Sequence, residues 1–146
     1  MLDEIVVNET LKEEALEINL KDISTLISQL RRVRRRYDDE LHKKEIAVYE
    51  ELAESLFELR SSKLLEGMKI KGFDSDFLDI INLMKKIYVN FISGKYFTKE
   101  DKILCYVKSS FSINNKTLNP GDLILLPLNQ VLALITLDYI TPLEVE

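Results

Sequence analysis

The chain is 146 residues long, 46% of them hydrophobic and 31% charged, and its net charge at pH 7 is −5. This composition is typical of a globular protein and excludes a disordered chain. No stretch of about 18 residues is apolar enough to cross a bilayer, and the start lacks the basic region of a signal peptide. A single cysteine excludes an internal disulfide framework. These features predict a cytoplasmic protein of one domain, or of one domain with a small addition.

The charge is distributed unevenly along the chain. Residues 1–30 carry a net charge of −5, residues 31–100 of +2, and residues 101–146 of −2. The whole molecule is therefore not an electrostatic match for nucleic acid. Any contact with DNA is expected to be local or to come from a partner.

Apolar residues recur at helical spacing up to about residue 95. Near the start, Thr10 and Glu13 form a possible capping box, which predicts a short acidic helix ending near Ile18. A second helix is predicted to begin at Asp22 or Ser24. Its apolar face contains Ile23, Leu26, Ile27, Leu30, Val33, Tyr37 and Leu41.

The second helix carries a run of arginines. Five of the residues 31–36 are arginine, which suggests a DNA-binding face. The acidic residues 38–40 follow the arginines 34–36 at a distance of four positions. In one continuous helix these pairs form a solvated network of ion pairs. The sequence therefore favours a solvated charged face over contact with nucleic acid.

A third helix is predicted from Lys43 to Leu65, with Gly67 as its stop. Its apolar residues cover an arc of about 200°, which indicates one face packed on its own domain and another on a second subunit. These residues are Ile46, Val48, Tyr49, Leu52, Ala53, Leu56, Phe57, Leu59 and Leu64. Arg60 and Lys63 fall inside the arc, so each is expected to meet a carboxylate or to reach an interface edge.

A fourth helix is predicted from the cap at residues 74–76 to just before Gly94. Its polar strip is narrow, so it is also expected to be covered on most sides. A body of four helices has little surface to cover two such helices. This shortage strengthens the inference that the protein forms an oligomer.

The hydrophobic period changes around residues 96–101. Residues 102–112 then predict one or two strands, residues 119–122 a turn, and residues 123–126 a strand closed by Pro127. A short helix at 128–135 and a last strand at 138–141 complete the chain. The predicted class is α+β, with a helical bundle domain at residues 1–95, a linker at 96–101 and a small β-rich domain at 102–146.

No constellation of catalytic residues is found. The lone histidine, His42, and the lone cysteine, Cys105, lie in different predicted domains, which argues against a Cys-His nucleophile or a zinc site. The glycines form no phosphate-binding loop. We therefore expect no enzymatic activity, no cofactor and no metal.

Two motifs and their order resemble a known family. The long helix contains Leu59-Arg60 and Lys63, and the β-rich domain contains Gly121-Asp122 followed by aliphatic residues and Pro127. Together with the order of the domains, they resemble the archaeal GINS subunit that has its helical domain first. The resemblance covers roughly residues 33–146.

The resemblance implies a non-catalytic, nucleoid-associated scaffold of the replicative helicase. It implies a tetramer of two copies of this subunit and two of a sister subunit with swapped domain order. The implied partners are the MCM helicase, a RecJ-like protein and, in some archaea, primase, with DNA contact weak or indirect. By position, the resemblance implies that six residues of the third helix pack against another subunit: Tyr49, Leu52, Leu56, Leu59, Arg60 and Lys63. It assigns a shaping role in the β-rich domain to Gly121, Asp122 and Pro127.

The alternative is a small dimeric transcription regulator. Its helical part would dimerise, the β-rich domain would act as a wing, and the arginines would contact phosphates. The helix before the strands is apolar, which makes it a poor recognition helix.

Overall fold

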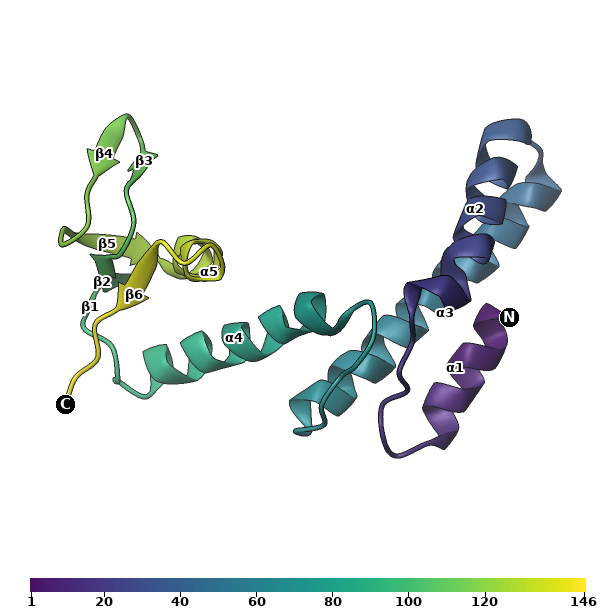
Figure 1. The fold of residues 1–146 in the computed structure, drawn as a ribbon, viewed down its shortest axis with the longest axis horizontal. Coiled ribbons are helices and arrows are strands. Elements are labelled where there is room, and N and C mark those ends of the chain that lie inside the picture. The colour runs from purple at the N-terminus through teal and green to yellow at the C-terminus, as the bar shows by residue number, and fades with distance from the viewer. The chain divides into compact units, whose positions relative to one another are not determined.

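The computed structural model describes residues 1–146 and divides into two compact units, Met1–Ile81 and Asn82–Glu146. We name them the helical unit and the β unit. The helices are α1 (Leu2–Leu11), α2 (Leu20–Arg36), α3 (Glu40–Leu65), α4 (Ser75–Ile92) and α5 (Leu128–Thr136) (Figure 1). The strands are β1 (Thr98–Lys99), β2 (Lys102–Val107), β3 (Phe111–Ile113), β4 (Lys116–Leu118), β5 (Leu123–Pro127) and β6 (Ile140–Pro142). This order confirms the predicted α+β class. None of the helices has the length and apolar character needed to span a membrane.

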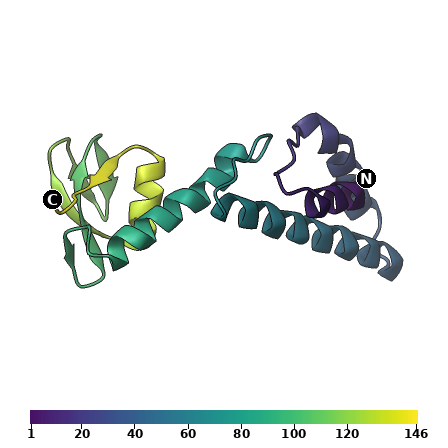
Figure 2. The same ribbon diagram turned by 90° about the horizontal axis from the view of Figure 1, so that it is seen from below.

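The helical unit is built on α3. Both α1 and α2 pack against it, and α1 and α2 are joined by an extended segment (Figures 1 and 2). A buried cluster of Leu64, Ile70 and Leu78 joins the end of α3 to the start of α4. The extended segment is held by a bridge between Ile18 and Gly72, where the Phe73 N–H donates to the Ile18 carbonyl at 2.8 Å.

The prediction of a helix from Thr10 to Ile18 was wrong. Helix α1 ends at Leu11, and the Thr10 hydroxyl donates to the Val6 carbonyl inside that helix. Residues 12–19, between α1 and α2, have no helical structure. The physical reason is Glu9, which is fully buried and ion-paired with α3. Because this pairing holds the end of α1 against α3, the capping motif begins no second helix.

The predicted network of i,i+4 ion pairs after the arginines was also wrong. Helix α2 ends at Arg36, and Tyr37 is already extended. Asp39 instead caps α3 and contacts His42, while Asp38 pairs with Lys43 at 3.3 Å. The acidic residues therefore belong to the start of α3, where carboxylates are favourable next to free backbone N–H groups.

The β unit contains an antiparallel sheet with β2 at its centre. Strand β5 pairs with β2 along its length, from Lys102 opposite Pro127 to Tyr106 opposite Leu123. Strands β1 and β6 both pair with β2 as well. Strands β3 and β4 form a separate hairpin, whose two-residue turn has Asn114 and Asn115 at positive φ. Asparagine tolerates this conformation better than most residues.

The core of the β unit includes part of α4. Ile87 from α4 is buried together with residues of β2, β5, α5 and β6, and with Tyr96. Residues 96–101, predicted to be a linker, thus contribute a core residue and contain β1. The division between the units falls inside α4, after Ile81, and not at the predicted linker. The cause is the long apolar face of α4, which supplies both cores.

Candidate subunit-binding groove

A buried cluster of charges fixes the shape of the helical unit. The Arg60 guanidinium, only 1% exposed, donates to both carboxylate oxygens of Asp74, from Nε at 2.6 Å and from Nη2 at 2.7 Å. Its Nη1 also donates to the Leu16 carbonyl at 2.7 Å and lies 3.4 Å from a Glu9 oxygen. A bidentate pair of this kind fixes both partners in one orientation. Arg60 thus joins α3 to the segment before α4 and to the segment after α1.

Lys63 extends the cluster along α3. Its ammonium lies 2.9 Å from a Glu9 carboxylate oxygen and donates to the backbone carbonyls of Glu9 and Glu14, at 2.5 and 3.0 Å. The expectation that Arg60 and Lys63 each meet a carboxylate is therefore confirmed. Both partners come from the same chain.

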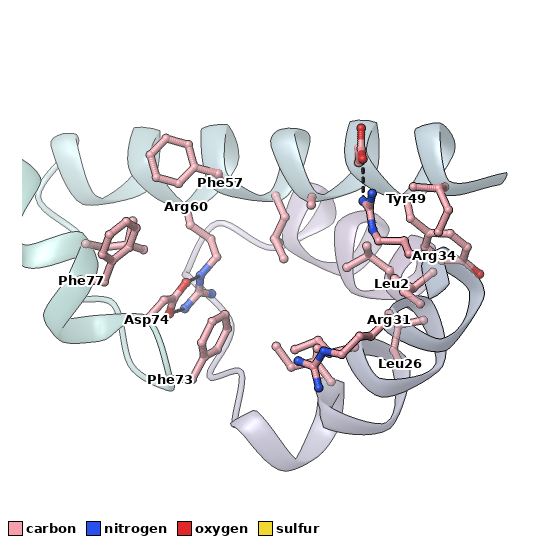
Figure 3. A pocket seen from close by; sticks show the side chains of 18 residues that line it. Leu2, Leu26, Arg31, Arg34, Tyr49, Phe57, Arg60, Phe73, Asp74 and Phe77 are labelled. Carbon is pink, nitrogen blue, oxygen red and sulfur yellow. Dashed lines mark hydrogen bonds and ion pairs between the residues drawn. The ribbon is translucent and has the colours of Figure 1, made fainter. Parts of the chain in front are cut away.

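An open apolar groove runs along the helical unit beside this cluster. Its volume is about 580 Å³. The apolar lining residues are Leu2, Ile23, Leu26, Ile27, Leu30, Ile46, Tyr49, Ala53, Leu56, Phe57, Phe73, Phe77 and Leu78. Figure 3 shows Phe73 and Phe77 near the Arg60–Asp74 pair at one end, and Leu2 and Leu26 at the other.

The groove stays open because α2 and α3 present more apolar surface than they cover. Ile27 on α2 is 39% exposed and Phe57 on α3 is 48% exposed, although both line the groove. Phe77, at the start of α4, is 65% exposed at its end. The only ion pair on the rim that joins α2 to α3 links Arg34 to Glu50 at 2.6 Å (Figure 3). A continuous apolar groove with a polar rim is typical of a protein-binding surface.

The candidate interface residues divide into two groups. Tyr49, Leu56 and Arg60 line the groove. Leu52 and Leu59 are half-buried on α3 outside its lining, and Lys63 is buried in the charge cluster. Arg60 and Lys63 are thus held by their own chain.

Other groove residues were missed. Leu2 lies in α1, which was not predicted as a helix from its first residues, and Phe73 lies in the segment before α4, so neither was assigned to a helical face. Phe77 lies on α4, but the sequence did not show that it faces α3. The apolar positions of α2 were predicted as one face of a helix, but the sequence did not show that this face forms the wall of an open groove.

The candidate shaping residues of the β unit lie at the two ends of β5, with Gly121 and Asp122 before its first residue and Pro127 as its last. Gly121 has a φ of +96° and donates its N–H to the Val107 carbonyl at 3.0 Å. The Asp122 carboxylate accepts from the Asn119 N–H at 2.8 Å, which closes the turn. Pro127 ends β5 and begins α5.

The lone cysteine is inert in this environment. Cys105 is completely buried at the centre of β2, and this burial raises the pKa of its thiol to about 12. A nucleophilic cysteine needs a lowered pKa and access to solvent. His42 lies in the other unit, stacked on Tyr37 with ring centroids 3.9 Å apart.

Comparison with protein families explains the order of the two units. The family model for the N-terminal domain of the GINS complex Gins15 subunit matches residues 1–74. The family model for the C-terminal domain of Gins15 matches residues 94–144. The chain belongs to the GINS family. No curated protein and no solved structure matches it.

This GINS subunit is a component of a DNA replication complex. The resemblance inferred from its motifs is confirmed at the level of the family. Membership in this family favours the replication-complex interpretation over the transcription regulator. The groove is located within residues 1–78, so it lies almost wholly in the part that matches the N-terminal domain.

Proposed function

We propose that this protein is a non-catalytic scaffold whose helical unit binds a sister GINS subunit through the apolar groove. The observation that carries the proposal is the groove itself, which has exposed aromatic residues in a chain that belongs to a complex-forming family. The occupant is an apolar helix of a sister subunit with swapped domain order. Two copies of each subunit form the tetramer.

We further propose that the assembled tetramer links the MCM helicase to a RecJ-like protein, and to primase where one joins the complex. The β unit offers a surface for such a partner. Tyr106 on β2 and Leu123 on β5 lie opposite each other in the sheet, and both are exposed. Leu125, two residues further along β5 and therefore on the same face, is also exposed. An exposed apolar patch on a small sheet supports a role in binding another protein.

The groove is tested by replacing Phe57 with aspartate. Because Phe57 is half-exposed, the substitution leaves the fold intact but places a charge in the groove. We expect Phe57→Asp to abolish assembly with the sister subunit, measured by light scattering after size-exclusion chromatography of the co-expressed chains. Leu65→Asp is the matched control, because Leu65 is 45% exposed on α3 outside the groove. Normal assembly of Phe57→Asp would refute the assignment.

The partner surface is tested separately. Leu123→Asp is expected to leave the tetramer intact and to reduce binding of the MCM or RecJ-like protein in a pull-down with the assembled complex. Unchanged binding of both proteins would place their contacts elsewhere.

A further inference from the structure

Four arginines on α2 have no acidic partner in this chain. Arg34 pairs with Glu50, but none of the others in the run forms an ion pair. These exposed residues are Arg31, Arg32, Arg35 and Arg36. The solvated network that would have explained them does not form, because α2 ends before the acidic residues. Arginines in the last turn of a helix stabilise it through the helix dipole, which accounts for Arg35 and Arg36. This effect does not account for Arg31 and Arg32, which lie one turn earlier.

The four arginines form one face. At about 100° per residue they fall within an arc of about 140°, on the side of α2 opposite Leu26 and Leu30. Arg34 lies outside that arc, on the side towards α3. With Ser28, the four line a shallow concavity of about 300 Å³. We name these four residues the arginine face.

We propose that the arginine face binds the phosphate backbone of DNA. Guanidinium groups bind phosphate oxygens in a bidentate manner, and arginine remains charged at any physiological pH. The four lie within about 8 Å of helix axis. Duplex DNA presents about one charge per 1.7 Å of its axis, so several phosphates come within reach of this face.

An acidic protein segment is the competing ligand, and the lining argues against it. Peptide-binding surfaces combine charges with an apolar pocket that holds an anchor residue. The concavity itself contains only arginines and one serine, and of the four arginines only Arg31 also borders the apolar groove. A surface of charges without an apolar anchor fits a regular polyanion that is bound without regard to sequence.

The net charge of the protein indicates that contact with DNA is confined to the arginine face. The net charge of −5 would be four units more negative without the arginine face. A negative net charge disfavours binding of DNA to the molecule as a whole, so the contact is expected at this face. The proposal goes beyond the scaffold role and does not depend on the occupant of the groove.

The test measures binding of a short, fluorescently labelled DNA duplex of arbitrary sequence by fluorescence anisotropy. It uses the full chain, both alone and assembled with its sister subunit, over about 50 to 200 mM salt. The variant combines Arg32→Gln, Arg35→Gln and Arg36→Gln. Arg31 is left unchanged because it also lines the apolar groove. The control combines Lys44→Gln, Lys69→Gln and Lys71→Gln, which removes the same charge from exposed positions of the same unit.

We expect the arginine variant to lose about tenfold or more in affinity at low salt, and the slope of log K against log salt to fall by about 2.7 for three lost phosphate contacts. The lysine control should retain its affinity within about twofold. Light scattering of each variant reports assembly separately from DNA binding.

Three results would overturn the proposal. The first is wild-type protein that does not bind the duplex at low salt. The second is an equal loss in both triple variants, which would indicate only bulk charge. The third is displacement of the DNA by a polyglutamate peptide at lower concentration than by unlabelled duplex, which would identify an acidic protein segment as the ligand.

Discussion

Glu9, Arg60 and Lys63 place three charged side chains in the interior of the helical unit. The sequence indicated the two cations, because both interrupt an apolar arc. It did not indicate the anion, since Glu9 lies among other carboxylates of an acidic segment and no pattern distinguishes it from Glu13 or Glu14. Only the packing of α1 against α3 brings Glu9 to Arg60 and Lys63.

Replacing Glu9 with leucine should strongly destabilise the helical unit. The change leaves the Lys63 ammonium buried without its carboxylate, and removal of one partner of a buried pair costs about 3 kcal/mol or more. The free energy of unfolding, measured by urea denaturation of the full chain, should fall by this amount. Glu13→Leu, at an exposed position, should change it by less than about 0.5 kcal/mol. Equal effects of the two changes would contradict the role given to Glu9.

Gly72 is a position where only glycine fits. Its φ is +120°, and a Cβ added there would lie 2.2 Å from the Ile18 carbonyl oxygen. Gly72→Ala should therefore separate the two bridged segments and lower the free energy of unfolding by at least about 2 kcal/mol. Gly67→Ala is the control, because Gly67 also has a positive φ but meets no atom within 4 Å. Gly67→Ala should lower the free energy of unfolding by about 1 kcal/mol. If Gly72→Ala lowers it by no more than this control does, the steric argument is refuted.

At the scale of elements, the boundary between α2 and α3 decides the role of the arginines. Helical periodicity continues across residues 37–41 in the sequence, so the end of α2 was not visible from spacing. Asp39 is a favourable N-cap residue for the next helix, and its carboxylate accepts from the His42 N–H at 3.4 Å. This local preference ends α2 early and leaves the arginine face without partners.

The capping role predicts different effects for two adjacent aspartates. Asp39→Ala should lower the Tm of the full chain by about 2–4 °C, because the first turn of α3 loses its cap. Asp38→Ala should leave the Tm within about 1 °C, since Asp38 makes only an exposed pair with Lys43. Thermal melts followed by circular dichroism distinguish the cases. Equal shifts would contradict the capping role given to Asp39.

At the scale of the whole molecule, α4 belongs to two compact units. Leu78 is buried in the core of the helical unit and Ile87 in that of the β unit. The sequence predicted the helix and its bounds closely, from residues 74–76 to Gly94. It placed the boundary between domains at the change of hydrophobic period, whereas the contacts place it after Ile81.

The shared helix predicts which fragments fold. Residues 82–146 should give a dispersed NMR spectrum of a folded domain, because this fragment retains Ile87 and Tyr96 in its core. Residues 102–146 lack both and should remain unfolded, since so short a chain has little other apolar surface to bury. A folded spectrum from the shorter fragment would contradict the assignment of α4 to the β core.

The sequence by itself determined the α+β class, the order of the two domains and the family, because these depend on local periodicity and short motifs. It also predicted most of the β unit, where turn residues such as Asn119 and Gly121 act over a few positions. The tertiary structure alone decided the partners of Arg60 and Lys63 and the open groove, because these depend on contacts between residues far apart in the chain, which no local pattern records. The structure also showed that α2 ends at Arg36, which leaves the arginine face unpaired, although the cause is the local preference of Asp39 to cap α3.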